Sequence, residues 1–392
     1  MALALLSHIR GDTYSGAERL FSDIAKLLRN KGFEVLCCYA TSYNQSADEL
    51  CLKPHGIKII NTSGKLECIL DIKYSINRTL LGFHHSLELK KLVEGLRPEL
   101  VFVAHEAFNP LQVTSNRREY TLMHYVHNPY EFVPDPSSYD IKFLSFLTKK
   151  CVIGEKDFSD IVLANSSSTR NECIKRWNRK DCIVLYPPIN VDEIPFCHSS
   201  AKKDICIVVS RIAPAKRIEL AIESFCSEIL KDKRLYIVGY LSKENKHYYY
   251  KLIGSCKKNS NIKIFPNLRR ADVLTLLSKA KVFFHPRPNE HFGIVTVEAM
   301  AAGCLPVVHA SRGPLEVVVN NGQYGFTYTE KSELPQLLDH AFSSAKDFQH
   351  KLRNRALDFD TRNFKKKFDM LIDRIYDNNS SNRRRSSRLL DN

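Results

Sequence analysis

The apolar and polar positions of the chain form two kinds of segment that alternate along it. Short runs rich in β-branched and other apolar residues are followed by longer segments whose apolar residues recur at helical spacing. Continuous apolar runs are typical of buried parallel strands, because helices cover both faces of a parallel sheet. The pattern therefore predicts an α/β fold made of β/α units on mostly parallel sheets.

The alternating segments fall into two series. The apolar runs of the first series are ALALLSHI, EVLCCYA, LVFVAHE, YTLMHYVH and DIVLANSS, and its first predicted helix is GAERLFSDIAKLLRNKG. The runs of the second series are DICIVVSRI, RLYIVGY, IKIFPN, KVFFHPRP and CLPVVHA. Two doubly wound, Rossmann-like domains that face each other across a cleft are the simplest interpretation. Open α/β sheets bind ligands at the carboxyl ends of their strands, so we expect the site there.

The domain boundaries follow from the stretch between the two series, which is polar and contains prolines, as interdomain linkers commonly do. It reads LYPPINVDEIPFCHSSAKKD. We predict an N-terminal domain over residues 1–186 and a C-terminal domain over 187–361. A helix over 362–378 should pack back on the N-terminal domain, because its apolar residues share one helical face. A basic, disordered tail is expected over 379–392.

Length and composition limit the class of protein. A chain of 392 residues is long enough for two or three domains, and an apolar content of 44% is ordinary for a globular protein. We expect no membrane-spanning helix, since no apolar run approaches the length that spanning requires. The start, MALALLSHIRGD, lacks the basic region and the long apolar stretch of a secretory signal. Twelve cysteines at scattered spacings suggest reduced thiols, and we expect a cytoplasmic protein.

The net charge of +15 favours anionic ligands. Such an excess of Lys and Arg attracts phosphates over long range, whether they belong to a nucleotide, a lipid headgroup or a nucleic acid. Charge alone does not choose among these classes.

The segment RPNEHFGIVTVEAMAAGCLPVV is the richest in candidate chemistry. Glu290 lies in a predicted loop, and Glu298 lies on a predicted helix that begins near Val295, runs to Ala302 and is ended by Gly303. Gly293 would let the backbone approach a ligand, and amides at the helix start would accept an anion such as a diphosphate. Carboxylates on either side could accept hydrogen bonds from hydroxyls of a ribose and a sugar. The alternative is that both acids are merely solvated.

Two basic residues follow the first strand of the second series. Arg211 comes just after that strand, and Lys216 comes at or before the next helix start, in SRIAPAKRIELAIESF. Fixed cations beside a helix start would stabilise the charge that develops on a departing diphosphate. The alternative is a pair of exposed basic residues in a basic chain.

These motifs together resemble family 4 of the retaining glycosyltransferases, which have the GT-B fold. The resemblance covers nearly the whole chain and is most specific in NEHFGIVTVEAMAAG. Its other segments, GAERLFSDIAKLL, YVHNP, NSSSTR and VLYPPINVD, are similar to the branch that transfers mannose from GDP-mannose to lipid-linked oligosaccharides. The resemblance thus implies a peripheral enzyme on the cytosolic face of a membrane, with a nucleotide sugar and a lipid-linked sugar as substrates.

The resemblance also assigns roles in donor binding. Glu290 would contact the donor sugar and Glu298 the ribose. Arg211 and Lys216 would hold the diphosphate. The amides around Phe292, Gly293 and Ile294 would complete the diphosphate site.

On the acceptor side, the resemblance places His127 of YVHNP near the reacting centre, where an imidazole could assist by hydrogen bonding. Gly16, Glu18 and Arg19 match the turn that binds the acceptor. The family commonly has several glycines in that turn, whereas this chain has YSGAER with one. The alternatives are a structural role for His127 and exposed first-turn positions for Glu18 and Arg19.

Neither a catalytic metal nor another cofactor is expected, because the resemblance implies retention by front-face attack, in which the leaving diphosphate helps to deprotonate the acceptor. Asp358 and Asp360 form a D-x-D sequence of the kind that binds metals in the other large glycosyltransferase fold. They precede the predicted last helix, however, so we expect helix capping instead.

Membrane contact is suggested by the segment YDIKFLSFLTKKCVIGEKDF, which mixes aromatic and basic residues. Packing against the N-terminal sheet explains that composition equally well.

Two alternative functions remain open at this stage. The first is a glycosyltransferase of the same fold that uses a UDP sugar for polysaccharide or glycolipid synthesis. The second, of another class, is a basic nucleic-acid-binding protein that keeps an inactive sugar-nucleotide domain. We expect no nucleic-acid partner, because the chain has no nucleic-acid motif and its charge is dispersed.

Overall fold

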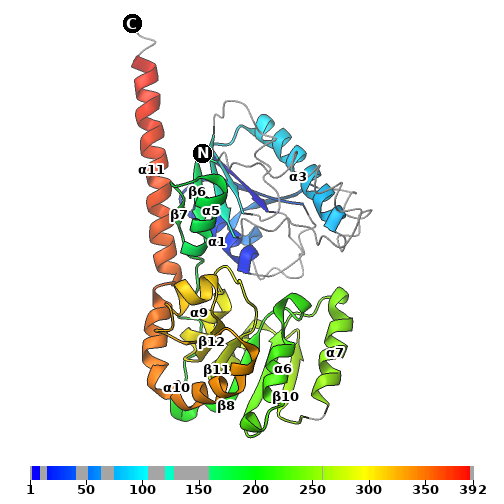
Figure 1. The fold of residues 1–392 in the computed structure, drawn as a ribbon. Coiled ribbons are helices and arrows are strands. Elements are labelled where there is room, and N and C mark those ends of the chain that lie inside the picture. The colour runs from blue at the N-terminus through cyan, green and yellow to red at the C-terminus, as the bar shows by residue number, and fades with distance from the viewer. Residues whose placement is uncertain are drawn as a thin grey trace. The chain divides into compact units, whose positions relative to one another are not determined.

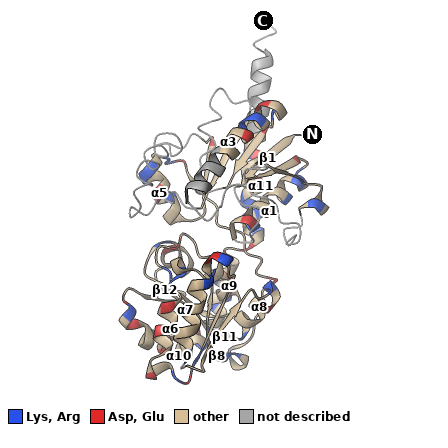
Figure 2. Ribbon diagram, turned by 90° about the vertical axis from the view of Figure 1, so that its right-hand side faces the viewer, with Lys and Arg blue, Asp and Glu red and all other residues tan. Residues whose placement is uncertain are grey.

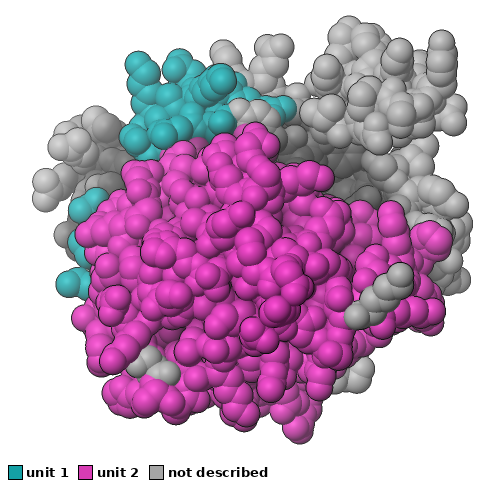
Figure 3. Space-filling model, turned by 60° about the horizontal axis from the view of Figure 1, so that its bottom comes forward, with its two compact units in different colours: residues 1–165, 169–186, 365–392 teal, residues 166–168, 187–364 magenta. Residues whose placement is uncertain are grey.

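The computed structural model describes residues 2–8, 16–40, 52–62, 75–104, 120–127, 159–257 and 259–388. The aromatic and basic segment at 139–158, which suggested membrane contact, lies outside these residues. The chain divides into two compact units (Figures 1 and 3). Unit 1 comprises residues 1–165, 169–186 and 365–392, and unit 2 comprises 166–168 and 187–364.

Unit 1 is built on a seven-stranded sheet with the order β3-β2-β1-β4-β5-β6-β7, in which every pair is parallel. Its strands are β1 (Leu3–His8), β2 (Glu34–Tyr39), β3 (Lys58–Asn61), β4 (Leu100–Val103), β5 (Thr121–Val126), β6 (Ile161–Ala164) and β7 (Ile183–Val184). Its helices are α1 (Gly16–Asn30), α3 (Ser75–Leu96), α5 (Ser167–Trp177) and most of α11 (Thr361–Arg388). The central strands are buried along most of their length, as their apolar runs predict.

Unit 2 contains a six-stranded parallel sheet with the order β10-β9-β8-β11-β12-β13. The strands are β8 (Lys203–Val209), β9 (Arg234–Gly239), β10 (Ile262–Pro266), β11 (Ala280–His285), β12 (Leu305–His309) and β13 (Phe326–Tyr328). The main helices are α6 (Glu219–Phe225), α7 (Lys246–Cys256), α8 (Arg270–Lys279), α9 (Ile294–Ala301) and α10 (Leu334–Leu357). Helices α9 and α10 pack against each other and on β11 and β12 (Figure 1). The predicted α/β class with two parallel sheets is confirmed.

Strand β8 is preceded by a buried lysine that fastens three segments of unit 2. The Lys202 Nζ donates to the carbonyl oxygens of Ser278, Ala280 and Ala302 at 2.8, 2.8 and 2.9 Å. A lysine ammonium has three donors and no acceptor, so these bonds satisfy it fully. The ends of α8 and α9 are thereby held at the start of β8.

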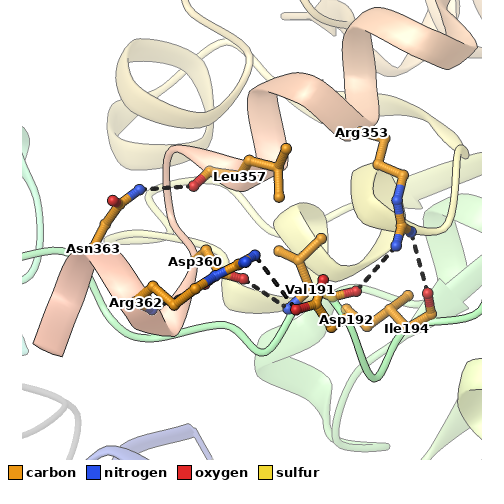
Figure 4. Close-up of polar contacts among 8 residues, drawn as sticks. All are labelled: Val191, Asp192, Ile194, Arg353, Leu357, Asp360, Arg362 and Asn363. Atoms are coloured by element: carbon orange, nitrogen blue, oxygen red, sulfur yellow. Dashed lines mark hydrogen bonds and ion pairs between the residues drawn. The ribbon is translucent and has the colours of Figure 1, made fainter.

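Residues 187–194 lie at the start of the predicted interdomain linker and are hydrogen-bonded to the junction of α10 and α11 within unit 2 (Figure 4). The Asp360 carboxylate accepts hydrogen bonds from the Arg362 amide at 2.9 Å and from the Val191 amide at 3.3 Å. The first of these caps the N-terminus of α11. The Arg353 guanidinium, on α10, donates to the carbonyl oxygens of Val191 and Ile194. Asp360 therefore caps a helix, as the sequence predicted.

The other acid of the D-x-D sequence points to a different partner. The Asp358 carboxylate accepts from Arg355 Nη1 at 2.7 Å. Among the described residues, no group of three or more His, Cys, Asp or Glu side chains is arranged to hold a metal.

The last helix differs from its predicted end. Helix α11 continues to Arg388, whereas the sequence predicted a helix to 378 and then a disordered tail. The physical reason is that residues 379–388 include four arginines, which are good helix formers, and neither Gly nor Pro. At its start the predicted apolar face is buried, with Phe368 fully inaccessible and Ile372 2% exposed. Lys31, at the end of α1, contacts Asp373 of α11 at 2.7 Å.

Candidate functional site

The two acids of the richest motif are placed by the carboxyl end of β11 and by the helix that follows it. Helix α9 starts at Ile294, one position before the predicted start, and Gly293 precedes it with φ +88°. This left-handed conformation favours glycine, since a Cβ there is strained. The amides of Ile294 and Val295 belong to the first turn and have no partner within the helix. They are thus the donors expected for an anion.

Glu290 lies in the loop between β11 and α9 and is ion-paired rather than merely solvated. Its Oε2 atom is 2.9 Å from Lys216 Nζ, and both side chains are largely buried, at 18% and 15% exposure. The same oxygen is 3.5 Å from His285 Nε2 and 3.6 Å from Arg287 Nη1. The solvated interpretation of Glu290 is therefore wrong.

The pKa of the Glu290 carboxyl reflects these neighbours. Burial alone would raise it, but a hydrogen bond from His285 and the charges of Lys216 and Arg287 hold the pKa well below its usual range. The carboxylate is thus ionised at neutral pH, and it can accept hydrogen bonds but not donate a proton.

Glu298 is also buried and paired. Its side chain is 2% exposed, and both of its oxygens accept hydrogen bonds from the guanidinium of Arg270, the first residue of α8. Such a bidentate pair fixes the plane of the carboxylate. A carboxylate oxygen can accept from more than one donor, so the pair with Arg270 does not by itself exclude a hydroxyl donor. The interpretation of Glu298 as a solvated helix-surface residue is wrong.

The two basic residues after β8 differ in their surroundings. Lys216 is the last residue of a short 3-10 helix, Pro214–Lys216, which turns it toward Glu290. Arg211 lies two residues after the end of β8 and its side chain is exposed. Lys216 and Glu290 are thus brought into contact, whereas Arg211 stands at the same edge of the sheet with an accessible guanidinium.

The loop that carries Glu290 is held from the segment after β12. The Gly313 amide donates to the Glu290 carbonyl oxygen at 3.1 Å, and the Asn289 amide donates to Ser311 Oγ at 2.8 Å. Asn289 itself has φ +57°, a region that asparagine tolerates better than most residues. Phe292 anchors the other end of the loop, since its ring is 2% exposed and packs edge-on against Phe359.

Several of these site residues were not singled out from the sequence. His285 and Arg287 precede Glu290 by five and three residues, whereas Arg270, at the start of α8, and Gly313, after β12, adjoin the predicted residues only once the sheet is formed. The one signal available was position, because His285 closes the strand run KVFFH and Arg287 stands three residues before Glu290. Arg270 and Gly313 carried no such signal.

The predicted acceptor residues lie in unit 1. Gly16 is the first described residue of α1, and Glu18 is 3% exposed, which contradicts its interpretation as an exposed first-turn residue. Arg19 is half-buried. His127 follows β5 directly, is 8% exposed, and its carbonyl oxygen accepts from Asn165 Nδ2 at 3.0 Å.

A buried histidine network lies at the carboxyl edge of the same sheet. His85 Nε2 is 2.8 Å from Ser7 Oγ, and His85 Nδ1 is hydrogen-bonded to Thr62 Oγ1. Thr62 Oγ1 also lies 3.1 Å from the Tyr39 carbonyl oxygen, which favours the tautomer in which His85 donates from Nδ1 and accepts at Nε2. The network ties β1, β2 and α3 together through a neutral imidazole.

Acid should weaken unit 1 through this histidine. Burial, followed by the nearby His8 and His84, lowers the pKa of His85 to about 3. Below the unfolded pKa of about 6.5 the unfolded chain therefore binds a proton that the folded chain does not. Stability is lost as pH falls from about 6.5 toward 3, by about 1.4 kcal/mol per pH unit. We expect the urea midpoint of wild type to drop between pH 7 and pH 5 by more than that of His85→Gln.

The matched control is His55→Gln, at an exposed position in the short helix Lys53–His55. Its urea midpoint should fall with pH as much as that of wild type. An equal fall for the wild type and His85→Gln would contradict the assignment of His85 as a buried, neutral base.

A surface cavity of about 410 Å³ lies elsewhere in unit 2, at the amino ends of β9 and β10. Most of its charged lining residues are basic, and none of the predicted site residues lines it. Figure 2 shows basic and acidic positions on elements of both units. Among the described helices, none is long and apolar enough to cross a membrane.

The chain is similar to known proteins in both of its domains. Residues 14–193 match the family model Glycosyltransferase Family 4, and residues 191–358 match Glycosyl transferases group 1. A curated relative from Mus musculus, named GDP-Man:Man(3)GlcNAc(2)-PP-Dol alpha-1,2-mannosyltransferase, is 28% identical over 50% of this chain and 44% of its own length. The chain spans about half the length of the curated relatives it matches.

Solved structures are similar over nearly the whole chain. The sucrose-phosphate synthase of Thermosynechococcus elongatus has a TM-score of 0.75 at 15% identity, over 96% of this chain and 99% of its own. Anabaena HepE in complex with UDP-glucose has a TM-score of 0.68 at 18% identity, over 97% and 100%. At these identities the likeness shows the fold, which is GT-B, as predicted.

Proposed function

Because the chain belongs to the glycosyltransferases that join a family 4 domain to a group 1 domain, we propose that it is a retaining hexosyltransferase that uses GDP-mannose. The acceptor would be a lipid-linked oligosaccharide, extended by an α-1,2-linked mannose. The protein would act at the cytosolic face of a membrane, as a peripheral enzyme. The observation that carries the proposal is the buried Glu290–Lys216 pair beside the start of α9.

The donor would be held by this pair and by the start of α9. Lys216 has three N–H donors, so it can keep Glu290 and still reach a diphosphate oxygen. Arg211 supplies a second, exposed cation, and the amides around Phe292, Gly293 and Ile294 supply neutral donors. Glu290 accepts hydrogen bonds from the sugar hydroxyls, and Glu298 accepts them from the ribose.

Transfer would proceed on one face of the sugar. The bond between the anomeric carbon and the diphosphate oxygen breaks while the acceptor oxygen bonds to the same carbon. The acceptor proton passes to the departing diphosphate oxygen, and the cations stabilise the charge that develops there. His127 assists the acceptor by hydrogen bonding, and Gly16, Glu18 and Arg19 belong to the acceptor site. Glu290 serves as a binding group, since its ionised carboxylate has no proton to give.

A donor and acceptor panel tests the proposal. Purified protein would be given radiolabelled GDP-mannose, UDP-glucose or UDP-N-acetylglucosamine with a lipid-linked oligosaccharide that ends in mannose. Label should enter the lipid fraction from GDP-mannose alone, and α-1,2-mannosidase should release it. Transfer from a UDP sugar would overturn the donor assignment. A failure of every donor, with nucleic-acid binding that weakens steeply with salt, would favour the binding-protein alternative.

Metal independence is part of the same proposal. We expect transfer to be unchanged after exhaustive dialysis against EDTA, because Lys216, Arg211 and the amides at the start of α9 supply the positive potential that a leaving diphosphate needs. The measurement is the initial rate before dialysis, after it, and after Mg²⁺ or Mn²⁺ is added back. A rate that vanishes and returns with either metal would contradict this account.

A further inference from the structure

His285 is the last residue of β11, which lies between β8 and β12 in the sheet of unit 2. Its side chain is 8% exposed. A short aromatic side chain at the end of a central strand has few accessible rotamers, so its orientation is set by the sheet. Lys216 and Arg287, by contrast, reach Glu290 through long flexible stems.

The three neighbours of Glu290 all approach the same oxygen. Lys216, His285 and Arg287 lie 2.9, 3.5 and 3.6 Å from Oε2. Within the described part of the chain, no hydrogen bond reaches Oε1. The carboxylate is therefore oriented with one oxygen occupied by the protein and the other available to a ligand hydroxyl.

The hydrogen-bonding nitrogen of His285 follows from its surroundings. Nε2 lies 3.5 Å from Glu290 Oε2, so it must carry a proton if it donates to the carboxylate. Nδ1 is buried and has no hydrogen-bond partner among the described residues. A proton on Nδ1 would have no acceptor, so the Nε2–H tautomer is the one that fits.

We propose that His285 is a positioning residue whose Nε2–H group fixes the Glu290 carboxylate and so directs Oε1 toward a hydroxyl of the donor sugar. The inference rests on the proposed function, because it assigns Glu290 to the sugar. In this account Lys216 and Arg287 balance the charge of Glu290, and the imidazole of His285 fixes the orientation of the carboxylate. His285 acts through Glu290 and does not itself touch the substrate.

Three substitutions of His285 separate the contribution of its Nε2–H group from the contribution of its side-chain volume. His285→Gln places an amide N–H near the position of Nε2 and should keep transfer within about fivefold of wild type. His285→Asn can place its amide only near Nδ1, and His285→Leu has no donor. Both should lower kcat/KM for GDP-mannose by about 10- to 100-fold, the effect expected when one hydrogen bond to a charged group is lost. His340→Leu, at an exposed position on α10, is the control for losing an imidazole elsewhere in unit 2 and should leave transfer unchanged.

A double-mutant cycle distinguishes positioning from folding. In a Glu290→Gln background, His285→Leu should lower kcat/KM by less than about threefold, because its partner is already gone. A structural role would instead give the full loss in both backgrounds, together with a lower melting temperature in both. Equal losses for His285→Gln and His285→Leu would also overturn the proposal.

A second readout does not require activity. In protein labelled with ¹³C at glutamate carboxyl carbons, the pKa of Glu290 should rise in His285→Leu and stay low in His285→Gln. Absence of mannosyl transfer by wild type would defeat the proposed function while this titration still decides the role of His285. An unchanged titration of Glu290 in His285→Leu would defeat the inference.

Discussion

Glu290→Gln should lower kcat/KM for the donor by about 10²–10³, the largest loss that we expect from a single conservative substitution in this chain. Glutamine keeps the size of the side chain but removes the charge that balances Lys216, which lies 2.9 Å from the carboxylate. It also presents an amide N–H to neighbours that are themselves donors. Initial rates over a range of GDP-mannose concentrations measure the effect.

The control for this substitution is Glu316→Gln, an exposed acid in the turn Pro314–Val318. It carries the same change of charge close to the site and should leave the rates unchanged. Thermal melting of Glu290→Gln shows how much stability the lost ion pair costs, which is about 3–5 kcal/mol for a fully buried pair. A kcat/KM within about threefold of wild type would be incompatible with a sugar-binding role for Glu290.

Gly313→Ala should have the second largest effect, about 10² in kcat/KM, although Gly313 carries no reactive group. A Cβ at this position would lie 1.9 Å from the His291 carbonyl oxygen and 2.8 Å from the Phe292 Cα. Both are backbone atoms of the loop between Glu290 and α9, so the loop must move. Displacement of a binding group by about 1 Å is enough to cost two orders of magnitude in rate.

Gly254→Ala is the matched control for Gly313→Ala. Gly254 lies in α7, and a Cβ there would meet nothing within 4 Å. Alanine in a helix should leave activity unchanged and stabilise unit 2 by about 0.5–1 kcal/mol. Full activity of Gly313→Ala with a melting temperature like that of wild type would show that the loop position does not matter.

The sequence was sufficient for the fold class, because central parallel strands buried on both faces leave a local signal, whereas the edge strands β3, β7 and β13 were not among the predicted runs. The runs DICIVVSRI and KVFFHPRP became β8 and β11, and the predicted helix after Glu290 became α9, displaced by one residue. Gly303 has a positive φ just after α9, which agrees with its interpretation as the residue that ends the helix.

Only those residues of the candidate site that lie in one continuous segment of the sequence were predictable. Glu290, Phe292, Gly293, Ile294 and Glu298 lie in one segment, and their spacing carried the prediction. Their partners come from elsewhere, as Arg270 does for Glu298 and Gly313 does for the Glu290 carbonyl. Strand order and register decide those pairings, and local periodicity predicts neither of them.

The burial of single side chains and the ends of helices were also not predicted by the local pattern. Glu18, in the first turn of α1, was open to interpretation as an exposed residue, yet it is 3% exposed. Helix α11 was predicted to end at 378 because polar residues follow, yet it extends to Arg388. Composition marks a segment as polar, but helix propensity and absence of a breaker decide where the helix ends.

The most direct test of the account is calorimetric binding of GDP-mannose and of GDP to wild type, Glu290→Gln and Glu298→Gln. Glu290 is assigned to the sugar, so Glu290→Gln should bind GDP at least as tightly as wild type and should lose the added affinity that mannose provides. Glu298 is assigned to the ribose, so Glu298→Gln should weaken both ligands by the same factor. Equal weakening of both ligands by Glu290→Gln, or unchanged binding by Glu298→Gln, would contradict the account.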